Sequence, residues 1–222
     1  FKRLKKEMID GIKSGLKASN DEELGKEVLY STLYKGHPYE SYNYGDISDL
    51  EAITLDDVKA FYNSELTQSK LTLGLIGAVP NALKANIMSD LATLPKGEQS
   101  RLSIPDAPVL KGHHATIVEK SAQSTAVSFG FPIDTIRSSE DWTALWLVRS
   151  YFGEHRSSNS YLYERIRQTR GMNYGDYSYI EYFPRGMFQT KPDANLGRSE
   201  QIFQIWLRPL RSNNDAHFAT RT

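Results

Sequence analysis

The chain has 222 residues, and its 27 Lys and Arg balance 27 Asp and Glu, so the formal net charge is zero. This balance argues against a dedicated nucleic-acid surface or a polybasic membrane surface, because both require an excess of positive charge. Hydrophobic residues make up 39% of the chain, which is enough to build a core and excludes wholesale disorder. Cysteine is absent, which excludes disulfide bonds and thiol chemistry. No apolar run approaches the roughly 18 residues that a membrane span needs.

The N-terminal stretch has the pattern of two helices followed by a loop. Residues 1–17 place apolar side chains at three- and four-residue steps, which predicts one amphipathic helix. Asn20 followed by Glu23 is a capping-box pattern and predicts a second helix over residues 22–34. Residues 35–46 carry glycine and proline turn signals, so we expect a loop there.

A helix, a strand and a further helix are predicted next. Thr54 and Asp57 form another cap pair ahead of a helix over residues 55–66. The run KLTLGLIGAV, residues 70–79, is short, apolar and rich in branched side chains, which predicts a buried strand. Asn81 is expected to cap the helix that follows.

The chain changes character near its middle. Residues 95–114 carry three prolines and two glycines, which is typical of an extended linker, and we place that linker at residues 97–114. Beyond it, strands are predicted at residues 115–120, 124–133, 173–183 and 200–210, with helices at residues 138–153 and 160–170. Each half is therefore mixed α and β, with sheets that we expect to be largely antiparallel.

One ordered string in the first half points to a known family. LYKGHPYESYNYGDISDLEAITLDDVKAFYNSELTQSKLTLGLIG, residues 33–77, combines a His-Pro-Tyr loop, a capped helix and an apolar run ending in glycine. It resembles a segment of the insulinase/pitrilysin-type zinc metallopeptidases, which include the mitochondrial processing peptidases. The matching positions are His37, Pro38, Tyr39, Gly45, Ile53, Thr54, Asp57, Phe61, Tyr62 and Gly77. Glu40 stands where the family pattern has a glycine.

A second stretch, SYLYERIRQTRGMNYGDYSY at residues 160–179, resembles another segment of the same family. The matching positions are Ser160, Leu162, Ile166, Arg167, Gly171 and Tyr174. Tyr161 replaces the usual arginine, and Gln168 replaces the usual glutamate. The order and spacing of the two stretches together carry the resemblance, which extends over residues 1–218.

The resemblance implies an α+β fold of two consecutive α/β rolls, each with an antiparallel-rich sheet and helices on one face. Residues 1–96 would form the C-terminal part of the first roll, residues 97–114 the linker, and residues 115–222 the second roll. In this interpretation the chain is a piece of a longer protein. The first roll lacks its N-terminal part, and the second is truncated at its C-terminus.

Zinc chemistry in this family depends on a His-x-x-Glu-His motif and a downstream glutamate, with one position open for the attacking water. None of the five histidines of this chain belongs to such a motif, so the zinc ligands are expected outside it. The downstream glutamate aligns without gaps near Lys13, which would repel zinc, and Glu7 and Asp10 are the nearest acids. Either a small insertion shifts the register, or this half has lost the zinc site.

Arg167 and Tyr174 are the candidate substrate-binding residues. They lie on either side of Gly171, at a predicted helix-to-strand turn. The resemblance implies that this pair reaches into the zinc chamber from the opposite half and donates hydrogen bonds to the substrate carbonyl beside the scissile bond. The residue types suit that role, because Arg offers five donors in a fixed fork and a Tyr hydroxyl stabilises an oxyanion. The alternative is a surface salt bridge for Arg167 and simple packing for Tyr174.

Other histidines and tyrosines receive structural interpretations. His37, which precedes a proline in a loop, is expected to fix the loop geometry by hydrogen bonding. His113 and His114 are expected to be exposed in the linker. The four tyrosines within residues 174–182 are expected to pack in a strand rather than to stack on bases, because the chain is neutral and alternate residues of a strand face opposite sides.

Two functions remain open at this stage. The first is a segment of a zinc metalloendopeptidase that encloses and hydrolyses short unfolded peptides in a chamber between two bowl-shaped halves. The second is a non-catalytic partner half or scaffold that binds peptide or protein without hydrolysis. The implied partners are a peptide substrate and the complementary half, in the same chain or in a second subunit. The compartment is also open, although the resemblance favours export to the bacterial periplasm or beyond, where relatives are often found.

Overall fold

The computed structural model describes residues 1–42, 45–98, 103–122, 124–154, 157–183 and 196–211. Contacts divide the chain into unit 1, made of Phe1–Lys5 and Ile47–Ser103, and unit 2, made of Lys6–Asp46 and Ile104–Thr222. This grouping differs from the predicted halves 1–96 and 115–222 with their linker at 97–114. The reason is the helix over residues 21–33, which packs on strands of the second half.

Unit 1 contains short helices: α3 (Ile47–Ala52), α4 (Leu55–Glu65) and α5 (Asn81–Leu91). The predicted cap of α4 is confirmed, since the Thr54 side chain accepts from the Asp57 N–H at 3.2 Å and Asp57 accepts in return from the Thr54 N–H at 2.8 Å. The predicted cap of α5 is wrong, because Pro80 occupies the N-cap and Asn81 is already helical. Proline suits that entry because its ring fixes φ.

The strand predicted at residues 70–79 does not form. Within the described residues of unit 1 there is no strand, and Leu71, Leu73 and Ile76 are exposed. An apolar run becomes a strand only when a neighbouring strand satisfies its backbone groups. The prediction of a buried strand is therefore wrong, because no described segment pairs with this run.

Two helical segments lead into the core of unit 2. The helix predicted over residues 1–17 is present as α1 (Lys2–Asp10), which starts in unit 1, and a π-helical continuation η1 (Gly11–Ala18). α2 (Asp21–Leu33) follows, and its predicted cap is confirmed, because Asn20 Oδ1 accepts from the Glu23 N–H at 3.1 Å. No helix in the described part of the chain is long and apolar enough to span a membrane.

The sheet of unit 2 has three antiparallel strands in the order β1-β3-β2. The strands are β1 (Ser124–Ile133), β2 (Asp176–Tyr179) and β3 (Gln201–Arg211). The first and last agree with the predicted strands, whereas the one predicted at residues 173–183 is reduced to four residues. The strand predicted at residues 115–120 is wrong, since the described residues 103–122 form none. β1 therefore lies at the edge of the described sheet.

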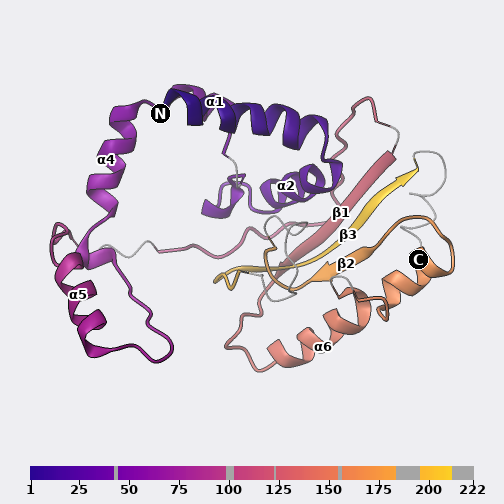
Figure 1. The fold of residues 1–222 in the computed structure, drawn as a ribbon. Coiled ribbons are helices and arrows are strands. Elements are labelled where there is room, and N and C mark those ends of the chain that lie inside the picture. Colours follow the sequence, from indigo (N-terminus) through magenta and orange to yellow (C-terminus); the bar gives the residue numbers. More distant parts are fainter. Residues whose placement is uncertain (43–44, 99–102, 123, 155–156, 184–195, 212–222) are drawn as a thin grey trace. The chain divides into compact units, whose positions relative to one another are not determined.

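Helices cover both faces of this sheet, as Figure 1 shows. On one face α2 contacts β3: the Tyr30 hydroxyl donates to Gln204 Oε1 at 2.6 Å, and Lys26 Nζ lies 4.0 Å from the centre of the Trp206 ring. The opposite face receives α6 (Trp142–Gly153) and the π-helical η4 (Tyr163–Gln168). The α+β class is confirmed, and the second roll's own helices lie on one face as expected, while α2 covers the other.

Apolar packing on the second face fixes the position of η4. Leu162 and Ile166 pack against Ile205 and Leu207 of β3, and all four are buried. Burial of such side chains contributes about 1.5–3 kcal/mol each. η4 therefore presents its other side to solvent from a fixed base, which is the side that carries Arg167.

Candidate functional site

Arg167 and Tyr174 come together at the turn after η4. The turn begins when the Gly171 N–H donates to the Arg167 carbonyl at 2.8 Å, and Gly171 has φ of +60°. Glycine adopts this left-handed conformation without steric cost, so it ends the helix and reverses the chain. The chain then enters β2 at Asp176.

The guanidinium of Arg167 is held by contacts on more than one side. Its Nη1 donates to the Tyr174 carbonyl at 2.9 Å. Its Cζ lies 4.9 Å from the centre of the Tyr163 ring and 5.3 Å from that of Tyr174. Cation–π contacts at these distances stabilise one orientation of the guanidinium at the surface. The bond to Tyr174 uses one of the five N–H donors that a guanidinium has.

Tyr174 differs from the tyrosines that follow it. Its side chain is 77% exposed, whereas Tyr177, Tyr179 and Tyr182 are at most 5% exposed. The expected strand packing is thus confirmed for Tyr177 and Tyr179 of β2, and Tyr182 is buried beside its isolated bridge to Leu196. For Tyr174 the packing expectation is wrong, because its side chain is exposed. Tyr174 instead places its ring and hydroxyl at the surface beside Arg167. The two predicted residues share one place, and their role in binding a substrate stays a prediction.

Asn173 and Asp176 form polar contacts next to Arg167 and Tyr174 in the chain. Asn173 Nδ2 donates to Asp176 Oδ1 at 2.5 Å, and Asn173 Oδ1 accepts from the Gly175 N–H at 3.2 Å. Asp176 has no measurable exposure. Burial disfavours its charged form and raises its pKa to about 7, against the lowering effects of Asn173 and Arg208. A carboxyl with this pKa changes charge near neutral pH.

Asn173 and Asp176 were not predicted from the sequence. Both stand in the quoted stretch NYGDYSY, which was interpreted only as the start of a strand. An acid that opens a run of aromatic residues is a weak signal for a buried carboxyl. The burial of Glu22, Glu23 and Glu27 in α2 was likewise not predicted. Glu22 and Glu23 lie in the first turn of the helix, where acidic side chains are normally solvated.

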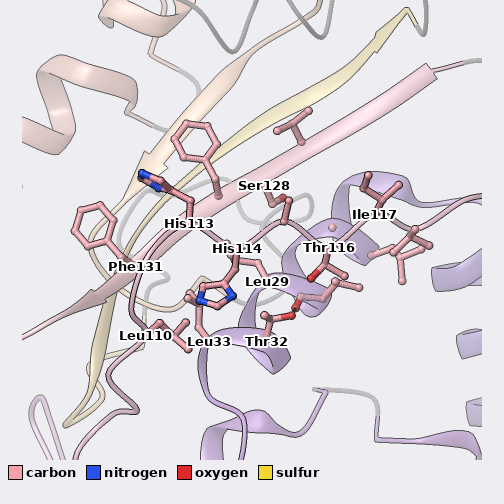
Figure 2. Close-up of a pocket in the computed structure, with 18 of the residues that line it drawn as sticks. Leu29, Thr32, Leu33, Leu110, His113, His114, Thr116, Ile117, Ser128 and Phe131 are labelled. Carbon is pink, nitrogen blue, oxygen red and sulfur yellow. Dashed lines mark hydrogen bonds between the residues drawn. The ribbon is translucent and has the colours of Figure 1, made fainter.

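A cavity of about 1460 Å³ is a second candidate site in unit 2, and Figure 2 shows side chains that line it. The lining includes Leu29 and Thr32 of α2, Phe131 of β1, and His114 of the segment 103–122 that forms no strand. Most of the lining is apolar, and the Asp21–Lys120 ion pair, at 2.6 Å, belongs to its polar rim. The cavity lacks a converging set of catalytic groups among the described residues, and we assign no reaction to it.

The histidines behave as structural residues where they are described. His37 is buried, its Nδ1 accepts from the Tyr39 N–H at 3.1 Å, and its Nε2 lies 2.9 Å from the Pro105 carbonyl. The Nε2–H tautomer satisfies both contacts, and the predicted loop-fixing role is confirmed. His113 and His114 are exposed as expected. The remaining two histidines, at positions 155 and 217, lie outside the described residues.

The residues near the expected zinc ligand do not form a metal site by themselves. Glu7, Asp10 and Lys13 are exposed on the first helical segment, and Asp10 pairs with Lys6. A zinc site in a peptidase needs three protein ligands at one point. Among the described residues no three His, Asp or Glu side chains come together in this way. No catalytic step is assigned to this segment.

Comparison with known proteins decides the family. The sequence pattern described as "Peptidase M16 inactive domain" matches residues 52–218, which is more than half of the chain. The chain belongs to the M16 peptidase family. This confirms the insulinase/pitrilysin-type resemblance. It also adds that the matched M16 domain is of the inactive type, and that its sequence match contains both Arg167 and Tyr174.

Individual relatives agree with this M16 assignment. The chain is 22% identical over 199 residues to "Probable inactive metalloprotease YmfF" of Bacillus subtilis (strain 168), a match that covers 86% of the chain and 44% of that relative. The chain thus spans less than half of the relative's length.

Solved structures share the fold. An M16 inactive domain from Pseudomonas fluorescens matches with a TM-score of 0.76 at 21% identity, over 99% of this chain and 49% of that one. A protease from Helicobacter pylori matches with a TM-score of 0.69 at 15% identity, over 95% and 47%. A chain of Complex III2 from Candida albicans matches with a TM-score of 0.68 at 12% identity, over 98% and 49%.

Proposed function

We propose that this M16 chain is a non-catalytic half that binds an extended peptide through its backbone. The single observation that carries the proposal is the convergence of Arg167 and Tyr174 on one exposed place. A guanidinium and a phenol both donate hydrogen bonds, and a peptide carbonyl accepts two. Backbone recognition of this kind suits unfolded peptides of varied sequence, because every residue carries the same carbonyl group.

Two comparisons support the non-catalytic part. The matched domain is of the inactive type, and one relative is named a probable inactive metalloprotease. We propose that a complementary half, in the same chain or a second subunit, completes the peptide chamber. If the whole protein hydrolyses peptides, its zinc ligands lie outside these 222 residues.

The test uses the full-length protein and a fluorescein-labelled octapeptide of alternating Ala and Ser with blocked ends. Its binding is measured by fluorescence anisotropy. Arg167→Ala should weaken binding about tenfold, because about 1.4 kcal/mol of interaction with the carbonyl is lost. Tyr174→Phe should weaken it about threefold, since it removes one neutral hydrogen bond and keeps the ring.

Arg165→Ala is the matched control, because Arg165 is an exposed arginine of the same helix whose Cζ lies 5.9 Å from the Tyr161 ring. It should bind the peptide as the unaltered protein does. Equal affinities for the Arg167→Ala and Arg165→Ala variants would overturn the proposal. Elemental analysis for zinc and a peptide turnover assay on the same preparation separate a binding half from a peptidase part.

A further inference from the structure

We propose that Asn173 and Asp176 are positioning residues that hold the turn at residues 171–175, so that Arg167 and Tyr174 face the same peptide group. This inference rests on the proposed function. In this proposal Asn173 and Asp176 do not contact the peptide; they act by holding the turn.

The first end of the turn is fixed by the helix. The Gly171 N–H donates to the Arg167 carbonyl at 2.8 Å, and the Met172 N–H donates to the Ile166 carbonyl at 3.2 Å. Ile166 is fully buried against β3, so these bonds start from a rigid base. They set the direction in which the chain leaves η4, but they do not reach Tyr174.

The second end is fixed by the Asn173 side chain. Its Oδ1 accepts from the Gly175 N–H at 3.2 Å, and this N–H belongs to the same peptide group as the Tyr174 carbonyl. That carbonyl accepts from Arg167 Nη1 at 2.9 Å. Because a peptide group is planar, fixing its N–H also fixes the direction of its carbonyl. Asn173 therefore holds the peptide plane that anchors Arg167.

Asp176 in turn holds Asn173. Its Oδ1 accepts from Asn173 Nδ2 at 2.5 Å, and its backbone is fixed because it pairs with Leu207 in the sheet. Asp176 Oδ2 is buried and has no hydrogen-bond partner among the described residues. Burying a carboxyl in this way costs free energy, so stability alone would favour an apolar residue at this position. The hydrogen bond to Asn173 is a role for the carboxyl that an apolar residue could not perform.

The experiment measures binding of the same labelled Ala-Ser octapeptide to the full-length protein. Asp176→Leu removes the acceptor and replaces the carboxyl with a larger apolar side chain, and we expect about fivefold weaker binding, as for the loss of one hydrogen bond. Asp176→Asn keeps an acceptor for Asn173 and should restore binding to within about twofold. Asn173→Ala should reproduce the Asp176→Leu defect, and it decides the question if Asp176→Leu does not fold.

Asp134→Ala is the matched control, because Asp134 is an exposed acid of the same unit, and its affinity should be unchanged. Thermal unfolding of each variant shows whether a loss of binding follows a loss of structure. If Arg167→Ala weakens binding while Asn173→Ala, in a folded protein, does not, the positioning role is overturned and the proposed function stands. If Arg167→Ala itself does not weaken binding, the proposed function is wrong, and the positioning role that rests on it is wrong as well.

Discussion

The two units of this M16 chain use similar sequence patterns with opposite results. In unit 2, β3 is buried along most of its length, between α2 on one face and α6 with η4 on the other. In unit 1, neither α4 nor α5 has a buried residue, and the apolar run at 70–79 forms no strand. This comparison shows that apolar periodicity indicates which face of a segment can be buried. Burial itself requires another surface that packs against that face.

The largest expected effect compares two glycines. A Cβ added at Gly130 of β1 would lie 2.3 Å from the Phe203 carbonyl oxygen and 3.0 Å from Gln204 Cα, both backbone atoms that cannot move aside cheaply. Gly130→Ala should therefore lower the free energy of unfolding by about 3 kcal/mol, at the upper end for overpacking. Urea unfolding followed by tryptophan fluorescence measures the change, because Trp206 lies in the same sheet.

Gly74→Ala is the counterpart in unit 1. No atom lies within 4 Å of a Cβ at Gly74, so the change should stay within about 0.5 kcal/mol. A large loss of stability at Gly74 would show that the extended run of unit 1 is packed against something in solution. Equal effects at both glycines would contradict the contrast between the units.

An effect of similar size is expected from the pH dependence of unit 2. Burial raises the pKa of Asp176 to about 7, from an ordinary value of 3.8, while Asn173 and Arg208 of β3 lower it and Glu22 of α2 raises it. Because the folded-state pKa lies above the unfolded value, the stability from this group is full below the unfolded value. It is lost as pH rises through the folded value.

Asp176→Asn removes this titration. The free energy of unfolding of the unaltered protein, relative to this variant, should fall by on the order of a few kcal/mol between pH 4 and pH 7 and then level off. Urea unfolding at several pH values measures it, with Asp134→Asn as an exposed control. A difference that stays constant over that range would mean that Asp176 does not change its charge there. Burial also raises the pKa of Glu22, but Glu22 is present in both proteins, so its own titration cancels in this difference.

The smallest effect is expected on the exposed face of α4. Phe61 is 69% exposed, so Phe61→Ser should change the free energy of unfolding by no more than about 0.5 kcal/mol. Thermal unfolding of the full-length protein measures this. A loss above about 1.5 kcal/mol would show that another part of the protein covers this face of α4, because only a buried aromatic ring contributes that much.

The sequence predicted the local features that depend on neighbouring residues. The caps at Asn20 and Thr54 are present because each side chain bonds a backbone N–H only three positions away. The turn at Gly171 also has a local signal, since a glycine directly after a predicted helix suits the left-handed φ found there. The family resemblance is what points to Arg167 and Tyr174, and the short turn explains why these two residues lie close together.

What the sequence could not decide depends on contacts between distant residues. Whether residues 70–79 and 115–120 pair as strands is set by the position of another strand, and α2 joins the second half because its buried face meets β3. The raised pKa of Asp176 likewise requires α2 and β3 to exclude water from around it. The amino-acid sequence alone determined the periodicity, the caps and the turn that brings Arg167 to Tyr174. Only the tertiary structure decided which apolar and charged groups leave water, because burial is a property of the surfaces that meet and not of one segment.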